Sequence, residues 1–108
     1  MSLGTNELLQ SNATTGDGTA KDILAVSREL KFYIIGSAGV TAGAVMLEEA
    51  HDAGYTGTWA PLEAPINVDA AAVVTRARSG CFRAVRARIT TTVEGGTVTV
   101  MVMGNKEP

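Results

Sequence analysis

The last part of the chain contains two runs of alternating apolar and polar side chains, separated by a pair of glycines. Residues 85–93 and 98–102 carry valine, alanine or isoleucine at most alternate positions. A period of two is typical of a strand with one buried face, and a glycine pair between two such runs is typical of a tight hairpin turn. The sequence therefore predicts a hairpin turning at Gly95 and Gly96, with Val93 paired with Val98, Thr91 with Val100 and Ile89 with Val102.

Further short strands are predicted upstream of this pair. Residues 23–26, 30–36 and 70–80 are rich in strand-forming side chains, whereas Pro61 and Pro65 restrict the segment 55–65 to a loop or a short edge strand. The segment 44–54 fits a strand over 44–50 followed by a loop better than it fits a helix ended by Gly54. About seven or eight short strands with turns between them predict an all-β fold, an antiparallel β-sandwich of jelly-roll-like type.

The first twenty residues show neither a helical nor a strand period. Their one apolar pair is Leu8 and Leu9, among Gly, Ser, Thr and Asn. Residues 1–20 are therefore predicted to form an extended N-terminal arm, and residues 21–108 a single sandwich domain. The arm is either a tail without consequence or a segment that orders against a neighbouring molecule through Leu8 and Leu9.

Composition and charge narrow the classes of partner and site. The 108-residue chain has a formal net charge of −2 and one cysteine, Cys81, so we expect no internal disulfide, no structural metal site and no cofactor. Neither a secretory signal nor a membrane-spanning run is visible. We therefore expect a soluble protein that is made in a cytoplasm and does not bind a membrane.

Arginines are concentrated in one stretch: five of the six lie between residues 76 and 88. On the predicted hairpin, Arg86 and Arg88 project from one face of a strand, and Arg76 and Arg78 share a face of the preceding strand. A solvated face partly neutralised by Glu48, Glu49 and Glu94 is one interpretation. Nucleic-acid binding fits poorly with a pI of about 5.3 and a stripe whose one aromatic is Phe82. Because arginine is enriched at protein interfaces, these four arginines are predicted partner contacts.

Signatures of the common catalytic classes are missing from the sequence. His51 has Glu48, Glu49 and Asp52 near it and is the one candidate for acid–base chemistry or carboxylate-assisted metal binding. Glu48 and Glu49 would face opposite sides of a strand, which excludes a paired-carboxylate site. We therefore expect no enzymatic activity.

Two stretches, "AVMLEEAHDAGYTGTWAPL" and "CFRAVRARITTTVEGGTVTVMVMG", carry a family resemblance. A "V-x-L-E" strand leads into an Asp/Gly loop and a Trp-containing edge, and a late arginine-rich strand turns through glycines into "TVTV". In this pattern the chain resembles the β-sandwich structural proteins of tailed bacteriophages. Its short length and polar arm are most similar to the capsid decoration, or cement, proteins of that group.

The resemblance implies a structural virion protein on the capsid exterior that bridges subunits of the major capsid protein, as a dimer or trimer. Leu8, Leu9, Arg76, Arg78, Arg86 and Arg88 would then contact the capsid or another copy. Two alternatives stay open: a phage tail or head–tail structural protein, and a small carbohydrate-binding sandwich in which Trp59 and Tyr55 form a stacking platform.

Overall fold

The structure is a computed structural model that describes residues 6–22, 27–79 and 83–106, and none of these residues is helical. One antiparallel sheet, the four-stranded sheet, has the strand order β1-β9-β3-β7. Its strands are β1 (Asn6–Ala13), β3 (Ser27–Gly36), β7 (Val73–Ser79) and β9 (Val98–Lys106).

The second antiparallel sheet, the five-stranded sheet, has the order β2-β8-β4-β5, and β6 also pairs with β4. Its strands are β2 (Lys21–Asp22), β4 (Ala42–Ala50), β5 (Ala60–Pro61), β6 (Ile66–Asn67) and β8 (Ala84–Glu94). The short β5 and β6 lie one after the other along β4, at opposite ends of that strand, so together they occupy one strand position.

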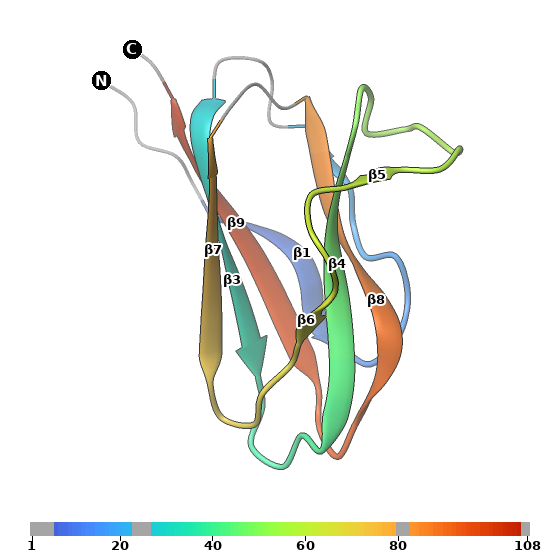
Figure 1. Cartoon of the computed structure of the whole chain (residues 1–108), viewed down its shortest axis with the longest axis vertical. Helices are drawn as coiled ribbons and strands as arrows, with labels where there is room; N and C mark the ends of the chain where they lie inside the picture. Colours follow the sequence, from blue (N-terminus) through green and yellow to red (C-terminus); the bar gives the residue numbers. More distant parts are fainter. Residues whose placement is uncertain (1–5, 23–26, 80–82, 107–108) are drawn as a thin grey trace.

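The chain changes sheet at nearly every step, from β1 through to β9, as Figure 1 shows. Eight strand positions divided between two sheets in this order are the connectivity of a jelly roll. The predicted antiparallel, jelly-roll-like sandwich is therefore confirmed. The strand predicted for 44–50 is also confirmed, since β4 ends at Ala50 and a loop follows.

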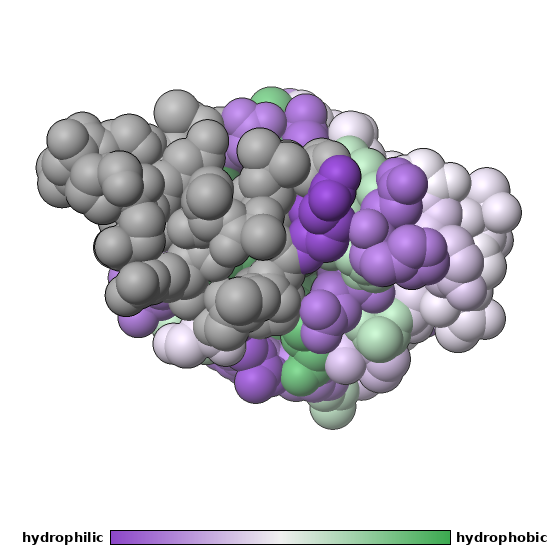
Figure 2. Space-filling model, turned by 90° about the horizontal axis from the view of Figure 1, so that it is seen from above, coloured by the Kyte–Doolittle hydropathy of each residue, from purple (hydrophilic) through white to green (hydrophobic). Residues whose placement is uncertain are grey.

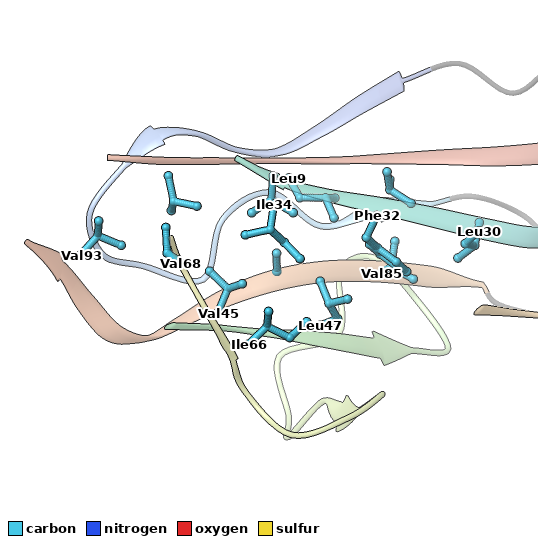
Figure 3. Packing of buried hydrophobic residues seen from close by; sticks show 14 of the residues in the cluster. Leu9, Leu30, Phe32, Ile34, Val45, Leu47, Ile66, Val68, Val85 and Val93 are labelled. Carbon is cyan, nitrogen blue, oxygen red and sulfur yellow. The ribbon is translucent and has the colours of Figure 1, made fainter. Parts of the chain in front are cut away.

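The core lies between the two sheets and is aliphatic except for Phe32 (Figure 3). The four-stranded sheet contributes mainly side chains of β3 and β9, and the five-stranded sheet contributes side chains of β4 and β8. Every second residue of β3 is buried, from Leu30 through Phe32 to Ile34. This is the period-two pattern that the sequence shows, because successive side chains of a strand point to opposite faces.

The predicted hairpin pairing of β8 with β9 is wrong. The two strands belong to different sheets: β8 pairs with β4 and β2, whereas β9 pairs with β3 and β1. The chain does fold back at residues 95–97, but it crosses from one sheet to the other. The alternation did not reveal this, because apolar faces that meet across a core have the same sequence period as apolar faces that lie side by side.

The crossing is built from two turns that pack against each other. Gly95 has φ 81°, and a Cβ atom there would lie 2.2 Å from the carbonyl oxygen of Gly39 in the β3–β4 turn. Thr41 N donates to the Glu94 carbonyl at 2.8 Å, and Ser37 N donates to the Thr97 carbonyl at 3.0 Å. A glycine is therefore favoured at position 95 for two reasons: its φ is positive, and the two turns approach each other too closely to leave room for a side chain.

The prediction of an extended arm over residues 1–20 is wrong for residues 6–13. These residues form strand β1, which pairs with β9 at the edge of the four-stranded sheet. A register shift between Leu8 and Gln10 turns both Leu9 and Gln10 inward. Gln10 Nε2 then donates to the Ala87 carbonyl of the other sheet at 2.8 Å. The domain therefore begins before residue 21.

Candidate interaction surfaces

Arg76 and Arg78 lie opposite Phe32 and Leu30 in the β3–β7 register, so they start from the inner face of the four-stranded sheet at its edge. Glu63, between β5 and β6, bridges them. Arg76 Nε donates to Glu63 Oε2 and Arg78 Nη2 to Glu63 Oε1, both at 3.0 Å. Arg78 Nη2 also donates to the Leu62 carbonyl at 2.8 Å. This group, the Glu63 clamp, joins the free edges of the two sheets.

Arg86 and Arg88 project from the outer face of the five-stranded sheet, opposite Glu48 and Met46 on β4. Glu48 bridges them: Arg86 Nε donates to Glu48 Oε1 at 2.8 Å and Arg88 Nε to Glu48 Oε2 at 3.1 Å. The Glu48 side chain is only 3 % exposed. We call this group the Glu48 clamp. It is a buried, fork-shaped ion pair of the kind that arginine suits best.

The β4–β5 loop and the β1–β2 connection cover the Glu48 clamp. The guanidinium carbon of Arg86 lies 4.6 Å from the ring centroid of Trp59, and Asp17 Oδ2 lies 3.7 Å from Arg86 Nη1. Trp59 Nε1 donates to the Tyr55 carbonyl at 3.0 Å, which fixes the loop over the clamp. The loop projects beyond the sheets in Figure 1.

All four arginines predicted as partner contacts thus make ion pairs within the chain. Arg76 and Arg78 do share a face of their strand, as predicted, but β7 turns that face toward the gap between the sheets. Arg86 and Arg88 do face outward as predicted, but on the side opposite to β7 and β9. The four do not form one basic row, and none offers an unpaired guanidinium to a partner.

Leu8 and Leu9 were predicted to act together as an anchor, but their side chains point to opposite faces of strand β1. Leu9 is 1 % exposed and belongs to the core cluster. Leu8 is 47 % exposed and lies opposite Met101 on the outer face of the four-stranded sheet. Leu8 alone therefore keeps its predicted availability to a partner.

The outer face of the four-stranded sheet is broad and nearly uncharged. Leu8, Met101, Tyr33 and Thr75 form one row across all four strands. Neighbouring rows place Met103, Lys31 and Ala77 on one side and Thr99, Ile35 and Val73 on the other. We call these ten residues the exposed sheet face.

Apolar side chains dominate the exposed sheet face. Val73 is 57 % exposed, and most of the others are half-buried by their neighbours on the sheet. Lys31 is the one charged member, and its Nζ lies 5.5 Å from the ring centroid of Tyr33. Glu29 follows one row further along β3. Contiguous apolar surface of this kind marks interaction sites on soluble proteins.

The sequence pointed to only part of this face. The predicted hairpin, with Ile89 opposite Val102, would place Met101 and Met103 on the same face as Arg88, yet they lie in the other sheet. The available signal was the outward-facing set of β3, where Tyr33 and Ile35 alternate with the buried residues. A strand with apolar side chains on both faces indicates either burial on both sides or an uncovered interface.

A groove of about 440 Å³ lies beside the β4–β5 loop, and among its lining residues are Glu49, His51, Tyr55 and Arg83. The His51 and Tyr55 ring centroids are 4.8 Å apart. Glu48 lies in its own clamp and is not among the lining residues. Within the described residues no group of three His, Cys, Asp or Glu could hold a metal ion, and Cys81 lies outside them.

Trp59 does not form the stacking platform considered from the sequence. It is 2 % exposed, with Arg86 against its ring. A sugar ring needs an accessible aromatic face, so of the two aromatics considered for this platform only Tyr55, which is 39 % exposed, can offer one. In Figure 2 the view from the end that carries the termini shows no large apolar patch around the grey residues.

Comparisons with known proteins assign neither a family nor a function to this chain. No family model matches the chain, and neither does any curated protein or solved structure at a significant level. Among the described residues there is also no helix long and apolar enough to cross a membrane.

Proposed function

We propose that this protein is a non-enzymatic structural protein of a tailed-phage virion. It binds the exterior of the capsid and stabilises the shell by bridging subunits of the major capsid protein. The observation that carries the proposal is the exposed sheet face, because a flat apolar surface suits assembly with other proteins and not the capture of a small substrate.

The arrangement of the rest of the molecule supports an assembly role. Both charged clusters, the Glu48 clamp and the Glu63 clamp, are used to hold loops and sheet edges together. A rigid sandwich loses little conformational freedom on binding, which favours affinity. Many copies that bind the assembled lattice and not the separated subunits stabilise that lattice by mass action.

The test uses undecorated capsids assembled from the major capsid protein encoded in the same genome. We expect the purified protein to co-sediment with these capsids in a saturable, stoichiometric manner and to raise the temperature at which they disassemble. Absence of co-sedimentation up to about 100 µM, which would place the affinity below that of specific complexes, contradicts the proposal. Binding to purified tails instead of capsids would support the tail or head–tail alternative.

A further inference from the structure

The two outer surfaces of the sandwich differ in what covers them. The outer face of the five-stranded sheet carries the Glu48 clamp, with Trp59 and Asp17 packed on it. No described element packs on the exposed sheet face, whose central row runs across all four strands. The exposed sheet face is therefore the broad surface on which a partner molecule could pack.

We propose that the occupant of the exposed sheet face is a second copy of this chain, in a two-fold dimer with the two four-stranded sheets packed face to face. The inference deepens the proposed function, on which it rests for its biological role: a dimer that buries the two exposed sheet faces against each other presents the rest of its surface twice, and it can therefore bridge two capsid subunits.

The charge of the face favours a second copy over an unlike partner. A partner selected by charge requires charged groups to pair with, but Lys31 is the one charged member of the face and its ammonium already lies over Tyr33. Homodimer interfaces are the more apolar class. When such a face meets its own copy, Lys31 is the one charged side chain of the face that the contact has to accommodate.

The strand order allows a self-complementary contact. With a two-fold axis parallel to the strands, between β9 and β3, strand β3 of one copy lies over β9 of the other. Tyr33 of one copy then faces Met101 of the other, an aromatic–sulfur contact that occurs twice by symmetry. Lys31 stays near the margin of the contact, where its ammonium reaches water.

The size of the face predicts a modest affinity. Four strands about 4.8 Å apart and about six residues of about 3.4 Å give a footprint of roughly 400 Å² per copy. Standing side chains raise the accessible area above the footprint, toward the roughly 600 Å² per partner of the smallest specific interfaces. We therefore expect dissociation in the micromolar range, and assembly that responds to protein concentration.

The experiment is sedimentation velocity on the full chain over about 1 to 500 µM, which brackets micromolar dissociation constants. We compare the wild type with Tyr33→Glu and Val73→Glu on the face, and with Thr92→Glu, an exposed position on β8, as the matched control. Circular dichroism verifies that each variant is folded. We expect a monomer–dimer equilibrium that is weakened at least about tenfold by each face variant, since an unpaired buried charge is costly, and unchanged by Thr92→Glu.

A wild type that stays monomeric over the whole range overturns the dimer, and so does a dimer that survives both face substitutions. A trimer or larger assembly overturns the two-fold form. The capsid experiment separates this inference from the proposed function: a monomeric wild type that still binds capsids refutes only the dimer. A face-dependent dimer that binds no capsid refutes only the virion role.

Discussion

Glu48 and Glu63 each bridge two arginines, but they do so in different environments. The Glu48 side chain is 3 % exposed and its Arg86 partner 17 %, whereas Glu63 is 23 % exposed and Arg76 40 %. Exposed ion pairs contribute little because water and salt screen them. A buried pair adds little over an apolar contact, but removal of one partner leaves a desolvated charge and is strongly destabilising.

The same substitution at both sites therefore has unequal effects. Glu48→Gln should lower the free energy of unfolding by about 3 kcal/mol, because the largely buried Arg86 loses its close counter-charge and keeps only Asp17, 3.7 Å away. Glu63→Gln should cost less than about 1 kcal/mol. Urea unfolding of the two variants measures both values. Equal losses would show that the Glu48 clamp is not shielded from water as the structure describes it.

At the residue scale the sequence located the arginines and named Glu48 among the glutamates that could neutralise them, but it did not point to Glu63. Arg86 and Arg88 were placed correctly on an outward face, since the alternation of β8 determines it. Glu63 could not be assigned to Arg76 and Arg78, because the contact depends on how β5 and β6 lie along β4 and bring their connecting loop to β7.

At the scale of elements, the turn between β8 and β9 is defined by a neighbour as much as by its own residues. Gly95 and Gly16 both have positive φ, at 81° and 108°. A Cβ on Gly16 meets nothing within 4 Å, whereas a Cβ on Gly95 would lie 2.2 Å from the Gly39 carbonyl oxygen. Alanine substitutions at these two glycines therefore distinguish the cost of a positive φ, which both share, from the cost of the close approach of two turns, which applies to Gly95 alone.

Gly16→Ala should lower stability by about 1–2 kcal/mol, the cost of a left-handed conformation for alanine. Gly95→Ala carries the same cost and adds about 1–3 kcal/mol, because the two turns must move apart. Thermal unfolding of both variants tests the difference. If Gly95→Ala proves as mild as Gly16→Ala, the two turns do not pack as closely as described.

At the scale of the whole molecule, one core joins segments from both ends of the chain. Leu9 of β1 belongs to the same cluster as Val98, Val100 and Val102 of β9. The N-terminal residues therefore contribute to the stability of the whole sandwich, in contrast to an arm that could be removed without loss.

Adjacent leucines test this integration. Leu9→Ala should cost about 2–5 kcal/mol, since it opens a cavity in the core, whereas Leu8→Ala at a 47 % exposed position should cost less than about 1 kcal/mol. Denaturant unfolding of the two variants gives the comparison. Small losses for both would restore the arm predicted from the sequence.

The sequence by itself determined the long strands β3, β4, β7, β8 and β9 and the buried sides of β3 and β9, because these follow from side-chain alternation and from turn-forming residues, which are local properties. It did not predict β1, since residues 6–13 show no strand period. Only the tertiary structure decided that β8 and β9 enter different sheets, that Leu9 is internal, and that the outer sides of Tyr33 and Met101 share one uncovered face. These outcomes depend on strand order, and strand order is set by contacts between residues far apart in the chain, which a periodic pattern does not encode.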